Sequence, residues 1–241
     1  MGDTVRDDHV TITTVGRYDE VDCETFEVDG AGKVTGDLYA ATVSIDGAVK
    51  IGGDASGSEF DADGSLKVGG NLDGHEVTVD GAAKVGGSVV AADAEFDGSV
   101  KVDGLTDVTD FALDGSGKFG DINADTFRAD GSLTAGEVEA RSFELSVTSE
   151  SRARAVRATG ISVNQAAGGS LGQKLLGRGD PVFEVETIEG ETIELDATDA
   201  ETVVGDEVVL GDGVAVDVVY SDDVDAHPGA DVGDVRPRDE Y

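Results

Sequence analysis

The stretch IDGAVKIGG at residues 45–53 returns almost unchanged as VDGAAKVGG at residues 79–87. The shift is two multiples of 17. Asp-Gly pairs recur with that step at Asp29, Asp46, Asp63, Asp80, Asp97 and Asp114, and once more, slightly early, at Asp130. A fixed period of about 20 residues is typical of a solenoid, in which each repeat buries its apolar face only against its neighbours.

The length of the repeat predicts the shape of one coil. Seventeen residues at about 3.3 Å each make a closed path of roughly 56 Å, which suits three short strands and three corners. We therefore predict an all-β chain, a single-domain parallel β-helix with three sides and about 17 residues per coil. Asp-Gly suits a corner because Gly accepts a positive φ and Asp hydrogen-bonds its own turn.

An apolar alternation runs beside the Asp-Gly register, as in VDCETFEV at 21–28, LYAATVSI at 38–45 and VEARSFEL at 138–145. It continues beyond the Asp-Gly zone as VRATGISV at 156–163 and IEGETIEL at 188–195. Alternate residues of a strand point to opposite faces, so one set faces inward. The predicted core column is Phe26, Val43, Phe60, Val77, Phe111, Phe127 and Phe143.

A lysine follows each of the first six Asp-Gly corners in the pattern DGxxK, at Lys33, Lys50, Lys67, Lys84, Lys101 and Lys118. Coils stacked about 4.8 Å apart would place the Asp residues in a like-charge ladder. We interpret the lysines as compensation for that ladder. A ladder that binds a ligand is the alternative.

Composition and charge limit the setting. Seventeen basic and 52 acidic residues give a net charge of −35, and the chain has no Trp and one cysteine, Cys23. Concentrated salt screens such self-repulsion, so the charge suggests adaptation to a salt-saturated cytoplasm. Nucleic acid is not an expected partner, because phosphate binding needs the opposite sign. The sequence has no apolar leader and no run of about 20 apolar residues, which indicates a cytoplasmic protein.

One stretch breaks the acidic pattern. Residues 151–179 contain no Asp or Glu, and within them the segment 164–182 interrupts the repeat as a loop rich in Gly and Leu. The residues available for contact are Arg152, Arg154, Arg157, Leu171, Lys174, Leu175, Leu176 and Arg178. Three uses fit: peripheral contact with an anionic membrane surface, docking on an acidic partner or subunit, or an insertion without a role.

The remaining boundaries follow from the repeat. Residues 1–18 form an N-terminal segment or cap, 19–163 regular coils, 183–224 C-terminal coils and 225–241 a polar tail. Sequence leaves open whether the two end segments cover the terminal coils.

No enzyme motif emerges, and we expect no catalytic residue, no cofactor and no metal. The period is not a multiple of six, as the repeat of hexapeptide-type acyltransferases would require, and His9, His75 and His227 occupy unrelated contexts. A calcium-binding β-roll needs a nine-residue step, which IGGDASGSEFDADG at 51–64 does not keep. Cys23 aligns with Ala40, so we interpret it as a core residue.

The string VTGDLYAATVSIDG at 34–47 resembles the bactofilin family, and residues 193–233 are similar to the C-terminal coils of haloarchaeal members, the halofilins. The resemblance implies a right-handed triangular β-helix that polymerises without a nucleotide into a cytoskeletal scaffold affecting cell shape. Its partners would be further copies of itself or a second bactofilin-like protein, in the cytoplasm or at the inner face of the membrane. The other function class is a non-polymeric adaptor that binds a protein or the membrane through the basic loop.

The physics of a β-helix also favours assembly. Its terminal coils present backbone N–H and C=O groups without a neighbour, as an exposed sheet edge does. Matching ends can pair by β-augmentation.

Overall fold

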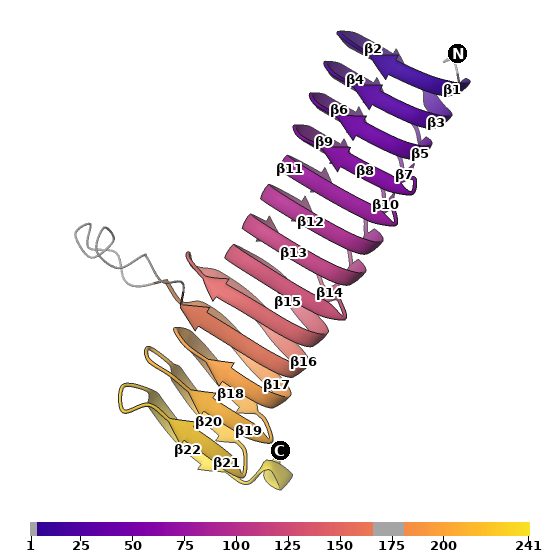
Figure 1. The fold of residues 1–241 in the computed structure, drawn as a ribbon. Coiled ribbons are helices and arrows are strands. Elements are labelled where there is room, and N and C mark those ends of the chain that lie inside the picture. The colour runs from indigo at the N-terminus through magenta and orange to yellow at the C-terminus, as the bar shows by residue number, and fades with distance from the viewer. Residues whose placement is uncertain (1–3, 166–180) are drawn as a thin grey trace, which may run out of the picture. The chain divides into compact units, whose positions relative to one another are not determined.

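The computed structural model describes residues 4–165 and 181–241, and these residues are almost entirely β-strand. The chain divides into two compact units, residues 1–123 and 124–241. Each unit is a parallel β-solenoid, in which strands of consecutive coils lie side by side (Figure 1). The predicted all-β solenoid with about 17 residues per coil is confirmed.

The strands are short in the first coils and merge around the corners later. Unit 1 contains β1 (Thr4–Ile12), β2 (Val15–Tyr18), β3 (Glu20–Val28), β4 (Ala31–Val34), β5 (Leu38–Ile45), β6 (Ala48–Ile51), β7 (Ala55–Ser56), β8 (Glu59–Ala62), β9 (Ser65–Val68), β10 (Leu72–Asp73), β11 (Glu76–Val85), β12 (Val89–Val102), β13 (Thr106–Lys118) and β14 (Ile122–Asn123). Unit 2 contains β15 (Thr126–Val147), β16 (Ser151–Gln165), β17 (Phe183–Leu195), β18 (Thr198–Val204), β19 (Glu207–Leu210), β20 (Ala215–Tyr220), β21 (Asp223–Ala226), β22 (Asp231–Arg236) and the 3₁₀ helix η1 (Arg238–Glu240).

Each coil of unit 1 has three strand segments, and the pairing from coil to coil keeps the 17-residue step. Leu38 pairs with Ala55, Val43 with Phe60, and Val49 with Leu66. The third segment of each coil forms one side of the unit, built from β2, β4, β6, β9 and the C-terminal ends of β11, β12 and β13. We call it the lysine side, because each coil from β4 onward places a lysine there.

Inward-facing side chains fill the space between the three sides. In unit 1 the chain of paired positions runs through Phe26, Val43, Phe60, Val77, Ala94 and Phe111, and all are buried. In unit 2, Phe127 and Phe143 are buried and their rings stack with centroids 4.8 Å apart. Ala94 is the member of the column that the sequence pattern omitted.

The Asp-Gly corners require glycine mainly because stacked coils approach closely. A Cβ at Gly47 would overlap the carbonyl oxygen of Gly30, and a Cβ at Gly64 that of Gly47. The expected positive φ occurs only in later coils, at Gly81, Gly98, Gly115 and Gly131. Close approach and backbone conformation together therefore explain the repeated glycine.

A second corner carries a ladder of side-chain hydrogen bonds that the sequence reading missed. The backbone N–H of Asp54 donates to Oδ1 of Asp37 at 2.9 Å, that of Asn71 to Oδ1 of Asp54 at 2.7 Å, and that of Ser88 to Oδ1 of Asn71 at 2.9 Å. Each side chain thus satisfies a backbone donor of the next coil.

Unit 2 has the same architecture with less regular coils. Phe143 pairs with Ile161, Ile193 with Val208, and Val208 with Val224, so the step is longer than 17 in the first case and shorter in the other two. β16 and β17 are direct neighbours although their paired positions lie nearly two periods apart in the sequence. The loop expected between these strands falls mostly on residues 166–180, outside the described residues.

Candidate interaction surfaces

The first coil of unit 1 is an open sheet edge. Residues 4–18 are not folded across the stack: β1 pairs in parallel with β3, and β2 with β4. Among the described residues, the registers pair each of these two strands with one strand only. Val15 at the start of β2 is 81% exposed. The N-terminal coil therefore offers unpaired backbone groups.

The last coil of unit 2 is the second open edge. The segment expected to be a polar tail contains β22, which pairs with β20, while β21 pairs with β19. Inward-facing Val235 pairs with Val219, which is fully buried, yet Val235 itself is 54% exposed. The apolar interior thus reaches the surface at this end, next to unpaired strand edges.

The C-terminal residues are held to the flank of unit 2. The Tyr241 hydroxyl donates to Oε1 of Glu189 at 3.0 Å, and its ring lies 5.2 Å from that of Tyr220. Arg238 forms an ion pair with Asp206. These contacts hold η1 beside the coils of unit 2 (Figure 1), and Val235 remains 54% exposed.

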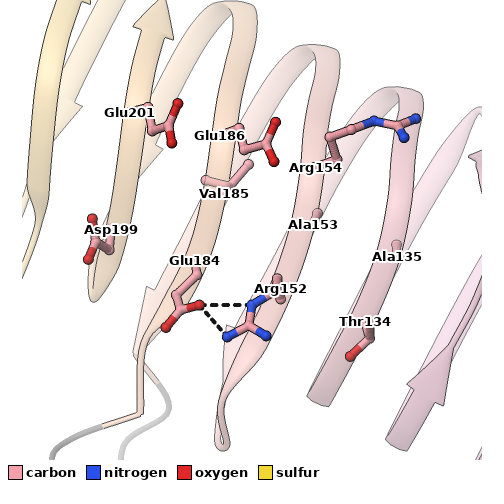
Figure 2. Close-up of a pocket in the computed structure, with 10 residues that line it drawn as sticks. All are labelled: Thr134, Ala135, Arg152, Ala153, Arg154, Glu184, Val185, Glu186, Asp199 and Glu201. Atoms are coloured by element: carbon pink, nitrogen blue, oxygen red, sulfur yellow. Dashed lines mark hydrogen bonds and ion pairs between the residues drawn. The ribbon is translucent and has the colours of Figure 1, made fainter.

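The three arginines on the coils of the acid-free stretch are all matched by glutamates of neighbouring coils. Arg152 Nε donates to Oε2 of Glu184 at 2.8 Å, as Figure 2 shows. Nη2 of Arg154 and Nη1 of Arg157 lie 3.0 and 3.1 Å from the two carboxylate oxygens of Glu137. Pairing of this kind removes most of the net positive charge that an anionic membrane would attract.

An open depression of about 440 Å³ lies beside this cluster on β15–β18, floored by Ala135, Ala153 and Val185. Its rim carries Thr134, Arg152, Arg154, Glu184, Glu186, Asp199 and Glu201 (Figure 2). Charges of both signs line it, and carboxylates outnumber guanidinium groups. The other contact residues predicted here, Leu171, Lys174, Leu175, Leu176 and Arg178, lie outside the described residues.

The corner aspartates and the lysines of unit 1 do not form ion pairs with one another among the described residues. The ion pair found for these lysines joins Lys101 to Asp103 at 2.6 Å, where the hydrogen bond from Lys101 lowers the pKa of Asp103. The charge compensation that we predicted from DGxxK therefore does not act through direct ion pairs between the described side chains of the two columns. Instead, Arg17, Lys33, Lys50, Lys67, Lys84, Lys101 and Lys118 form one column of paired positions. Like charges about 5 Å apart repel by roughly 0.8 kcal/mol per neighbouring pair in water.

The single cysteine, Cys23, is a poor nucleophile. Burial, together with the charges of Asp22 and Asp7, raises the pKa of the Cys23 thiol to about 11, which disfavours the nucleophilic thiolate. Across residues 4–165 and 181–241, no group of three or more His, Cys, Asp or Glu side chains is placed to hold a metal ion. Nor does this part of the chain contain a helix long and apolar enough to cross a membrane.

Comparison with known proteins adds no further constraint: neither a family model, nor a curated protein, nor a solved structure matches this chain.

Proposed function

We propose that this protein is a self-assembling, nucleotide-independent scaffold of the bactofilin type, which polymerises in the cytoplasm through the ends of its solenoid and contributes to cell shape. The proposal combines the sequence resemblance with two open terminal coils. Its main support is Val235: an inward-facing valine on the last coil remains 54% exposed, although its partner one coil inward is fully buried.

Pairing between terminal coils would satisfy two needs at once. The edges of β21 and β22 would gain backbone hydrogen bonds, and Val224, Val232 and Val235 would lose contact with water. Such an interface would extend the coil-on-coil stacking found inside each unit, although strands that meet across an isologous contact run antiparallel rather than parallel. Isologous contacts at both ends would build a filament without polarity.

The test is electron microscopy and sedimentation of the full chain in molar salt. The wild type should form filaments or sheets. Val235→Lys places a charge on the inward face of the last coil and should leave only single molecules, or pairs joined through their first coils. Asp225→Lys, which faces outward on the same coil, is the control and should polymerise normally. Wild-type protein that stays as uniform single molecules, or unchanged filaments from Val235→Lys, would refute the proposal.

A further inference from the structure

The lysine side repeats the same outward residue types in six successive coils of unit 1. Its strand segments contain no Asp or Glu, in a chain with a net charge of −35. From β4 onward, two residues of each segment face outward there, a lysine and a small residue. The small residues are Ala31, Ala48, Ser65, Ala82, Ser99 and Ser116, and all are exposed.

The buried residue between these two outward residues differs from coil to coil. It is Gly32, Val49, Leu66, Ala83, Val100 and Gly117 in successive coils. A repeat maintained only for packing should keep its buried residues and vary its exposed ones. On this side both exposed positions are kept, whereas of the two buried positions one changes and the other stays Val or Ile, at Val34, Ile51, Val68, Val85 and Val102. Packing alone gives no reason to keep the exposed pair, which indicates a binding role for the surface.

A second column of opposite charge runs beside the lysines. The corner aspartates Asp29, Asp46, Asp63, Asp80, Asp97 and Asp114 are all exposed and follow the same coil step. Each lies four positions before its lysine, and the small outward residue lies midway between them. The surface therefore consists of three parallel lines: negative, small and positive.

This arrangement selects the partner. An anionic membrane or a nucleic acid would attract the lysine column and repel an equally long aspartate column beside it. A second copy of this chain offers both signs at the same spacing of about 4.8 Å, so every coil of one copy can match a coil of the other.

We propose that two copies of this protein associate side by side through the lysine side, about a two-fold axis parallel to the stack of coils. This axis lies above the line of small residues, and rotation about it reverses the order of the three lines across the face. It therefore sets the lysine column of each copy against the corner aspartate column of the other. An antiparallel pair, with the axis across the face, would instead set lysine against lysine.

Two features of the surface fit this geometry. Alanine and serine on the midline allow the two faces to approach closely. Val15, 81% exposed, pairs with Ala31 and so continues the same line in the first coil. In an isologous pair it meets Val15 of the second copy.

The contact is modest in size. Six coils at about 4.8 Å by four residue steps of about 3.3 Å give roughly 380 Å² per copy, about half of a standard interface. Pairing should therefore be weak between isolated molecules and strengthened by repetition along a polymer. A covalent trap is accordingly the appropriate test.

The trap uses Cys23→Ala, which removes the single cysteine, together with Val235→Lys, which separates this contact from the proposed end-to-end assembly. Ser99→Cys places a thiol on the midline, and Ser56→Cys places one on a different side as the control. With a short bifunctional maleimide in molar salt, Ser99→Cys should give at least ten times more dimer on a denaturing gel. Equal yields would overturn the proposal.

Charge exchange tests the pairing itself. Variant A combines Lys67→Asp, Lys84→Asp and Lys101→Asp, and variant B combines Asp63→Lys, Asp80→Lys and Asp97→Lys, both in the Ser99→Cys background. Each alone should lose dimer yield about tenfold, because like charges then face each other. Mixing A with B should restore the yield, which also shows that both fold.

Full dimer yield from A or B alone would overturn the proposal, as would a mixture that fails to recover while both variants keep the wild-type circular dichroism. Binding of the parent protein to phosphatidylserine vesicles without midline crosslinks would instead assign this side to a membrane.

Discussion

Val77 in β11 lies directly beside Phe60 in β8, as the paired position of the next coil, and both side chains are buried. One full coil of the chain separates the two residues. Backbone hydrogen bonds on either side of the pair fix the spacing of the coils, for example His75 N–H to Ser58 O at 2.9 Å. A gap in the core column therefore cannot close by a local shift.

Phe60→Ala is expected to lower the free energy of unfolding by about 3–5 kcal/mol, the range for an aromatic residue removed from a tight core. Unfolding by heat or denaturant in molar salt measures the change. Glu59→Ala, at the preceding and exposed position, is the control and should stay within about 0.5 kcal/mol of the wild type. A loss below about 1 kcal/mol for Phe60→Ala would mean that the column is loosely packed.

The sequence predicted the fold because a solenoid repeats one local problem many times. A fixed step identifies the neighbours of every residue without knowledge of the remaining chain. Ala94 was left out of the predicted core column because it is a small residue at a position where most coils carry a large one. Strand β22 was missed for a related reason: with few neighbours, a terminal coil resembles a polar tail in composition.

The partners of the arginines were not predictable in the same way. Glu137 and Glu184 lie 17 and 32 residues from Arg154 and Arg152, the arginines that they contact. Which glutamate faces which arginine depends on coil lengths, and these vary in unit 2. The hydrogen-bond ladder of Asp37, Asp54 and Asn71 did leave a signal, since these residues recur at the 17-residue step.

Glycine at the corners offers a second prediction. Gly64→Ala should lower the free energy of unfolding by about 1–3 kcal/mol, because the new Cβ overlaps the carbonyl oxygen of Gly47 in the preceding coil. Gly160→Ala is the matched control, since a Cβ there meets no atom within 4 Å. The control should be neutral or stabilising by a few tenths of a kcal/mol. Equal effects in the two variants, measured by thermal unfolding, would contradict the steric explanation.

A substitution at Thr106 should raise the free energy of unfolding rather than lower it. Its side chain is fully buried between Val89 and Ile122, and its Oγ1 has no hydrogen-bond partner. Thr106→Val keeps the shape and removes the unpaired hydroxyl, so we expect stabilisation of about 1–3 kcal/mol.

Ser151 is the comparison for this substitution. It is also buried, but its Oγ accepts the backbone N–H of Leu133 at 3.1 Å. Ser151→Ala should therefore destabilise the protein by about 1 kcal/mol. Denaturant midpoints for both variants test the pair, and a destabilised Thr106→Val would show that the hydroxyl is satisfied.

Cys23 carries a prediction about pH. Because the pKa of its thiol is raised to about 11, alkylation of the folded protein at pH 8 should be roughly 200-fold slower than that of the unfolded chain. The rate should rise about tenfold per pH unit up to about pH 10 and level off near pH 11. Asp22→Asn removes a negative charge that disfavours the thiolate, so it should speed the reaction at pH 8.

The folded thiol also holds its proton to a higher pH than the unfolded one, and its contribution to stability is therefore lost between about pH 8.5 and pH 11. Alkylation at pH 8 as fast in the folded as in the unfolded state would show that the thiol is neither buried nor influenced by Asp22.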